Sequence, residues 1–134
     1  MPEHATHATP AAAVIYAKDV SRLSAFYEGV AGLAIMHAEA GYASLESASL
    51  QLFIVAMNPD IAARVQIAQP PEPRENTALK FIFPVVDIAA ARQLATEAGG
   101  MLKPASAEWG FNGYRHCDGH DPEGNVFQLR MRAG

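Results

Sequence analysis

The same series of secondary-structure signals occurs twice in the sequence, and this repeat is the strongest constraint on the fold. In each copy a strand-like segment is followed by an aspartate, by apolar residues at helical spacing and then by a glycine. Asp19 and Gly32 delimit the first predicted helix, and Asp87 and Gly100 delimit the second, 68 positions later. Aspartate is a good helix N-cap and glycine a good C-terminal stop. The ordered match predicts an internal duplication.

Both predicted helices are amphipathic and lie between strand-like segments. In the first helix the apolar face consists of Val20, Leu23, Phe26, Tyr27 and Val30. In the second it consists of Ile88, Ala91, Leu94 and Ala98. The order predicts βαβββ twice, which is an α+β fold. The expected strands span residues 11–18, 33–38, 42–45 and 50–57 in the first half and residues 79–86 and 125–132 in the second.

The chain length of 134 residues favours a single domain. We expect residues 1–10 to form a flexible N-terminus, because they show no periodicity. Residues 11–134 then form one domain of two modules. The first module covers residues 11–57 and the second covers residues 78–132. Residues 58–77, which include several prolines, are expected to connect them.

Composition and charge exclude several classes of function. The net charge is −4 and the basic residues are scattered, so no stripe exists to follow a nucleic-acid backbone. Cys117 is the only cysteine, which fits a reducing cytoplasm. The longest apolar run, Ala11–Ala17, is too short to span a bilayer, and no basic residue precedes it as in a signal peptide. We therefore expect a cytoplasmic protein that binds neither nucleic acid nor membrane.

Three stretches resemble the vicinal-oxygen-chelate superfamily of glyoxalases, bleomycin-resistance proteins and extradiol dioxygenases. The first runs from Lys18 to Leu33 and contains the pair Phe26-Tyr27. The second is Trp109-Gly110, and the third is the turn Asp121-Pro122-Glu123-Gly124-Asn125. The resemblance implies two βαβββ modules whose curved mixed sheets surround a cleft. Because curved half-sheets in this family usually close against another module, we also expect a homodimer.

The resemblance also locates the positions that hold a metal ion in metal-using members. In this chain they fall on Ala12, Gln51, Lys80 and Gln128. Alanine has no donor atom, protonated lysine repels a cation, and glutamine offers only a neutral oxygen. Shifting the alignment by one or two residues restores no ligand set. We expect no metal and no other cofactor in the cleft.

Strand alternation divides the side chains between a cleft face and a core face. The cleft face combines apolar and polar groups, and it places Lys80 and Arg130 against neutral partners. Such a cleft favours a planar or aromatic molecule with a carboxylate or similar oxyanion. The expected ligand-binding residues are Tyr16, Gln51, Phe53, Lys80, Trp109, Gln128 and Arg130.

Three residues are candidates for acid–base chemistry, namely His116, Lys80 and Tyr16. The polar stretch from His116 to Asp121 has two further interpretations, a non-standard metal site or a Cys–His nucleophile pair. Its simpler interpretation is a strand end whose polar side chains bond nearby backbone. For Trp109, Phe111 and Tyr114, packing within a hairpin is the alternative to ligand stacking.

The leading functional hypothesis is a metal-independent small-molecule-binding protein that sequesters a planar or aromatic acidic compound. It rests on a scaffold without the usual ligand quartet. The alternative is an enzyme with non-standard catalytic residues, either a glyoxalase-like lyase or isomerase or a dioxygenase relative. A purely structural or interaction role is the third hypothesis.

Overall fold

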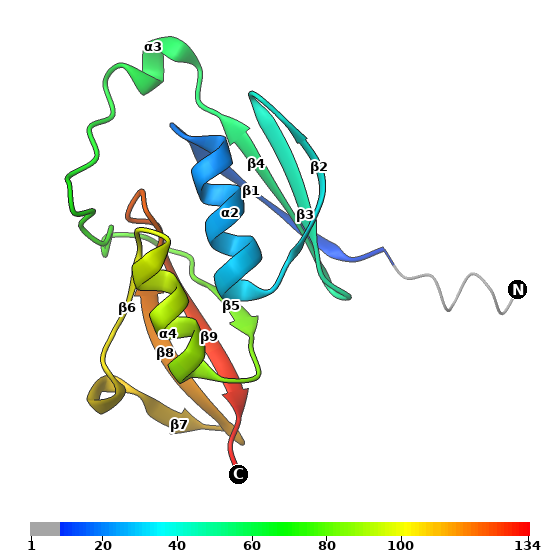
Figure 1. The fold of residues 1–134 in the computed structure, drawn as a ribbon, viewed down its shortest axis with the longest axis vertical. Coiled ribbons are helices and arrows are strands. Elements are labelled where there is room, and N and C mark those ends of the chain that lie inside the picture. Colours follow the sequence, from blue (N-terminus) through cyan, green and yellow to red (C-terminus); the bar gives the residue numbers. More distant parts are fainter. Residues whose placement is uncertain (1–8) are drawn as a thin grey trace, which may run out of the picture.

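The computed structural model describes residues 9–134, and it contains two sheets, each with one long helix against it (Figure 1). The expectation for residues 1–8 lies outside the described residues. The first sheet has the order β1-β4-β3-β2, in which β1 and β4 are parallel and the other pairs antiparallel. Its elements are β1 (Ala11–Ala17), α2 (Val20–Ala31), β2 (Ala34–Glu39), β3 (Tyr42–Glu46) and β4 (Leu50–Ala56).

The second sheet repeats this topology with one interruption. Its order is β5-β9-β8-β6, with β7 also paired to β8. Because β6 and β7 pair with successive stretches of β8, together they take the place that β2 has beside β3. The connector contains α3 (Pro59–Ala62). The second half comprises β5 (Phe81–Pro84), α4 (Ile88–Glu97), β6 (Met101–Leu102), the 3₁₀ turn η1 (Ala105–Ala107), β7 (Trp109–Phe111), β8 (Tyr114–His120) and β9 (Val126–Arg132).

The predicted helix caps are present. The Asp19 carboxylate accepts a hydrogen bond from the Arg22 backbone N–H at 3.0 Å, and Asp87 accepts one from Ala89 at 2.9 Å. Gly32 ends α2 in the left-handed conformation, with φ of 70°. The predicted face of α2 is buried throughout, but the prediction for α4 was partly wrong. Leu94 is exposed and the neighbouring Ala95 is buried, because the helix is rotated towards its smaller side chains.

Helix α2 joins the two halves through their apolar sides. Phe26 and Tyr27 both contact Phe127 of β9, with ring centroids 5.8 and 5.9 Å apart, and Tyr27 also contacts Phe83 of β5. Figure 1 shows α2 and α4 side by side, as their residue contacts require. The core of both halves is therefore continuous, and the relative position of the sheets depends on aromatic packing.

The turn before β9 also fastens the halves together. Fully buried Asp121 accepts hydrogen bonds from the Tyr27 hydroxyl at 2.7 Å and from the backbone N–H groups of Glu123 and Asn125. Glu123 accepts from the backbone N–H groups that precede α2, those of Lys18 and Asp19. Burial, and then the Asp121 carboxylate, raise the pKa of Tyr27 well above its ordinary value. The turn is thus a structural joint between the modules.

Within residues 9–134, none of the helices is both long and apolar enough to cross a membrane.

Candidate functional site

Each sheet has one side packed against helices and an opposite side that we call its inner face. On β1, Ala13 and Ala17 are buried, whereas Val14 and Tyr16 on the inner face are exposed. Strand β9 alternates in the same way, with Phe127 and Leu129 in the core. The cross-strand register puts the inner-face residues of β9 opposite those of β8. The inner faces therefore carry the side chains that strand alternation predicts for ligand contact.

On the second inner face, Trp109 of β7 covers His116 of β8. The two rings are parallel to within 6°, with their centroids 4.3 Å apart. His116 is only 5% exposed, whereas Trp109 is 41% exposed. Neither ring nitrogen of His116 has a hydrogen-bond partner within the described chain. A buried imidazole without partners is unusual in a folded protein and marks a place where a ligand or water can supply one.

Lys80 lies just before β5, and its ammonium is 3.5 Å from an Asp118 carboxylate oxygen. The expectation that Lys80 meets only neutral groups was therefore wrong. The alternation along β8 brings Asp118 onto the inner face, opposite Gln128. This carboxylate partly neutralises Lys80, so the lysine is a weaker anion site than expected. The other Asp118 oxygen is buried and has no hydrogen-bond partner in the described part of the chain.

Arg130 is the cation best placed for a negatively charged ligand. Its guanidinium lies 4.1 Å from the centre of the Tyr114 ring, an arrangement that fixes the side chain by a cation–π interaction. Arg132 is 5.6 Å from the same ring centre. Within residues 9–134 neither arginine forms an ion pair. Arg130 of β9 lies opposite His116 of β8 in the strand register, so the guanidinium lies beside the Trp109–His116 stack.

The first inner face is more apolar and carries a carboxylate. Gln51 lies beside Ala12 in the β1–β4 register and opposite Glu46 of β3. Phe53 stacks on Tyr42 with a centroid distance of 6.2 Å. Tyr16 is 63% exposed and is therefore not the buried acid–base group that catalysis by a tyrosine ordinarily needs.

A pocket of about 500 Å³ lies between the halves, where a cleft was expected, but of the seven predicted ligand-binding residues only Tyr16 lines it. Its volume is within the usual range for small-molecule pockets. Sequence alternation does not indicate the rest of the lining, because the pocket forms where two separate sheets and the connector meet. Aromatic and aliphatic groups from both halves line it together with polar connector residues, including Tyr16, Phe81, Phe83, Leu79, Arg74 and Asn76.

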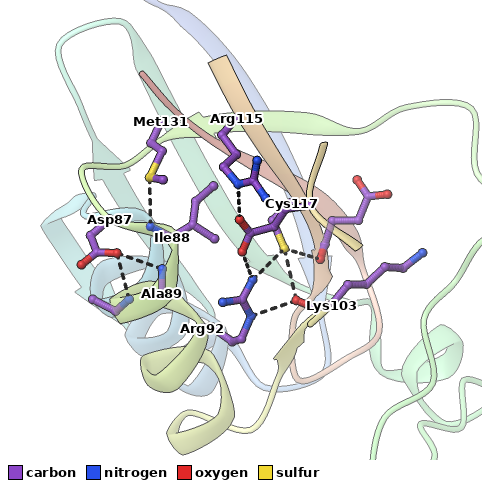
Figure 2. Close-up of polar contacts among 11 residues, drawn as sticks. Asp87, Ile88, Ala89, Arg92, Lys103, Arg115, Cys117 and Met131 are labelled. Atoms are coloured by element: carbon purple, nitrogen blue, oxygen red, sulfur yellow. Dashed lines mark hydrogen bonds and ion pairs between the residues drawn. The ribbon is translucent and has the colours of Figure 1, made fainter. Parts of the chain in front are cut away.

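On the opposite, helix-covered side of β8 lies a cluster around Arg92 of α4. Its guanidinium donates to the Lys103 carbonyl at 2.9 Å, to the Glu108 carboxylate and to the Cys117 sulfur at 3.6 Å. Figure 2 shows Arg92 between Lys103 and Cys117. Arg115 donates to the second Glu108 oxygen at 2.6 Å. The hydrogen bond from Arg92, aided by Arg115, lowers the pKa of Glu108, and Glu108 raises the pKa of Arg92.

The polar stretch from His116 to Asp121 does not form one reactive site. Cys117 points to the helix side while His116 points to the inner face, and burial raises the pKa of the Cys117 thiol. A buried thiol with a raised pKa is a poor nucleophile. Asp121 bonds nearby backbone, as the simpler interpretation of the stretch holds, but His116 does not. No three His, Cys, Asp or Glu side chains converge on a metal-sized space in the part of the chain that the structure describes.

The positions that bind metal in the resembling superfamily do not fit a metal here. Ala12 and Gln51 are neighbours in the first sheet, and Lys80 is engaged with Asp118 across from Gln128. A methyl group, two neutral amides and an ammonium provide no charged donor for a divalent ion.

Comparison with known families now complements this geometry. The family model of the glyoxalase-like domain matches residues 12–130, nearly the whole chain. The chain belongs to the glyoxalase-like family. This confirms the resemblance to the vicinal-oxygen-chelate superfamily and the α+β fold expected for it. No curated protein sequence matches the chain significantly.

Solved structures with this fold include enzymes and binding proteins. A glyoxalase/bleomycin resistance protein/dioxygenase family enzyme from Burkholderia phytofirmans PsJN has a TM-score of 0.64 and 23% identity, covering 94% of this chain and 100% of its own. The bleomycin-binding protein of Streptomyces verticillus, solved with copper(II)-bleomycin, has a TM-score of 0.55 and 20% identity, covering 96% and 98%. An antibiotic-binding protein from Streptomyces sp. CB03234 has a TM-score of 0.62 and 17% identity, covering 95% and 98%. At these identities the likeness concerns the fold.

Proposed function

We propose that this glyoxalase-like protein binds and sequesters a planar or aromatic small molecule bearing a carboxylate or similar oxyanion, without a metal ion. One observation carries the proposal: the Trp109–His116 stack adjoins Arg130, whose charge no carboxylate neutralises in residues 9–134. A ligand ring can stack on the exposed side of Trp109 while its oxyanion pairs with Arg130. The single cysteine supports a cytoplasmic location for this role.

The likeness to the bleomycin-binding and antibiotic-binding proteins supports a binding role. The ligand contacts that we propose are Trp109 and Arg130 with Lys80 and Gln128 on the second inner face, and Tyr16, Gln51 and Phe53 on the first. The relation between the two groups depends on assembly, because within residues 9–134 the strand pairing of Gln51 and the aromatic stacking of Phe53 both stay inside the first sheet.

The test compares 2-naphthoate with 2-naphthamide, which has the same ring system but no charge. Calorimetry should show naphthoate binding about tenfold more tightly, because only the carboxylate gains a charge-assisted bond to Arg130. Naphthoate should also quench the fluorescence of Trp109, the only tryptophan. An excess of EDTA should change neither result. Equal affinity for the amide, or loss of binding in EDTA, would contradict the proposal.

We further propose that a second copy of the chain covers the inner faces in a homodimer. The first inner face carries Glu46, whereas the second carries Arg132 at the end of β9, which has no ion-pair partner among residues 9–134 and can pair with Glu46 of the second copy while Arg130 is left for the ligand. Val14 and Tyr16 on one face and Ile82 and Trp109 on the other are 41–63% exposed. Complementary charge around apolar groups favours such a contact. A sedimentation mass of one chain at micromolar concentration would refute it.

The alternative function is a lyase or isomerase of the glyoxalase type with His116 as its base. The observation in its favour is that both imidazole nitrogens of His116 are buried and have no hydrogen-bond partner among residues 9–134. Turnover of a hemithioacetal that persists in chelator and is lost in His116→Gln would establish this chemistry. Absence of turnover with a range of hemithioacetals and catechols, combined with naphthoate binding, favours sequestration.

A further inference from the structure

Strand β7, which carries Trp109, is weakly held by its own sheet contacts. It has three residues, all exposed, and pairs with β8 alone. It follows the break formed by residues 103–108 between β6 and β7. A short edge strand of this kind opens readily, since few hydrogen bonds and little buried apolar surface hold it. The position of the Trp109 ring on His116 therefore needs another source of order.

That source lies one residue before Trp109. The Glu108 side chain is 8% exposed and its two carboxylate oxygens bind separate guanidinium groups, those of Arg92 and Arg115. Arg92 comes from α4 and is itself fixed by the Lys103 carbonyl and the Cys117 sulfur (Figure 2). We call Arg92, Glu108 and Arg115 the Glu108 clamp. It joins the start of β7 to both the helix layer and β8.

The clamp and the aromatic stack lie on opposite sides of the same two strands. Glu108 is directed to α4, and the next residue, Trp109, is directed to the inner face. In β8, Cys117 contacts the clamp and the preceding His116 contacts Trp109. Consecutive residues of a strand point to opposite sides, so fixing Glu108 fixes the direction of Trp109.

We propose that Glu108, held by Arg92 and Arg115, is a positioning residue that keeps the Trp109 ring stacked on His116 and ready for an aromatic ligand. The role in ligand binding rests on the proposed function, whereas the effect on Trp109 does not. The clamp acts on the orientation of the ring and touches no ligand itself. Glu108, a charged group on the helix side, thereby influences how tightly the inner face binds an aromatic ligand.

The experiment measures Trp109 directly. In Glu108→Gln, acrylamide quenching of tryptophan fluorescence should increase about twofold, because a freed side chain at a strand edge samples solvent on the nanosecond scale. The affinity for 2-naphthoate should fall about fivefold, as the ring must be ordered again on binding. Far-UV circular dichroism should be unchanged. Glu97→Gln, which changes an exposed acid of α4, is the matched control and should behave as wild type.

Two further variants keep the test decisive. Arg115→Gln removes only the more exposed arm of the clamp and should produce a smaller change in the same direction if Glu108→Gln fails to fold. Arg92→Lys retains the positive charge but loses the forked geometry of the guanidinium. Acrylamide quenching of Trp109 should therefore be greater in this variant than in the wild type. Wild-type quenching in both Glu108→Gln and Arg115→Gln would overturn the clamp. Failure of the wild type to bind naphthoate would refute the proposed function and leave the quenching result to decide the clamp.

Discussion

The two inner faces have the same strand topology but different chemistry. On the first, β2 is a single strand of six residues with one irregularity in its pairing to β3, and the prominent groups are Phe53, Tyr42 and the carboxylate of Glu46. On the second, the corresponding strand is divided into β6 and β7, and Trp109, His116 and Arg130 gather beside the second piece. The break between β6 and β7 contains Glu108, whose carboxylate reaches Arg92 of α4.

The difference teaches that one scaffold can keep its packing and still carry different chemistry in its two copies. Both halves use an aspartate cap and a strand whose alternate residues are buried. These features stabilise the fold wherever they occur. The ligand recognition that we propose depends instead on the groups left on the inner face, and those are not repeated between the halves.

The largest expected effect comes from Arg130→Gln, which tests whether the second face is the cationic one. We expect naphthoate binding to weaken about thirtyfold, equivalent to about 2 kcal/mol for a lost charge-assisted hydrogen bond. Calorimetry at constant ionic strength measures it. Gln51→Ala removes a proposed contact on the first face that is neutral, so it should weaken binding much less, by about fivefold at most. A similar loss in both variants would remove the asymmetry between the faces.

A smaller effect is expected for dimerisation in Glu46→Arg, which gives the first face the charge of the second. The dimer dissociation constant should rise about tenfold, because like charges would then face each other across the contact. Sedimentation velocity over a concentration series measures it. Glu97→Arg, on the exposed side of α4, makes the same charge change away from both faces. If Glu97→Arg weakens the dimer as much as Glu46→Arg does, the dimer contact lies on the helix side and not on the inner faces.

A still smaller effect is expected from Lys80→Met. Because Asp118 lies 3.5 Å from its ammonium, Lys80 should contribute about threefold or less to naphthoate affinity, as exposed ion pairs do. The same calorimetric titration applies. A tenfold or greater loss would show that Asp118 leaves Lys80 when the ligand binds, and would make the second face more cationic than its unliganded geometry indicates.

The smallest effect is expected for the free energy of unfolding in acid. It depends on the Glu108 clamp, which is found in the second half only among residues 9–134. The clamp lowers the pKa of Glu108, so its stabilisation is complete above the ordinary glutamate pKa of about 4.3 and disappears as pH falls through the lowered value. The difference in unfolding free energy between wild type and Glu108→Gln should therefore shrink below about pH 4. Urea denaturation from pH 7 to pH 3 measures it, and a constant difference would contradict the assignment.

The sequence by itself determined the fold class, the repeated strand–helix order and which sides of β1, β4 and β9 face the core. Those properties follow from local signals, such as the Asp19 and Asp87 caps and the alternation through Leu52 and Ile54, which act within a few residues. The family resemblance was also readable, since its motifs are short and contiguous. Leu94 was misplaced because four of the ten residues of α4 are alanines, so the sequence marks the face that packs on the core less sharply.

Only the tertiary structure decided which side chains meet. The Lys80–Asp118 pair joins residues 38 positions apart, and the Glu108 clamp joins α4, β7 and β8. The Trp109–His116 stack depends on how a short edge strand registers with β8. Such contacts arise from packing between elements that are distant in the chain. Local propensity and alternation predict the side on which a residue lies, but a partner on that side is chosen by three-dimensional register and by the space that neighbouring elements leave.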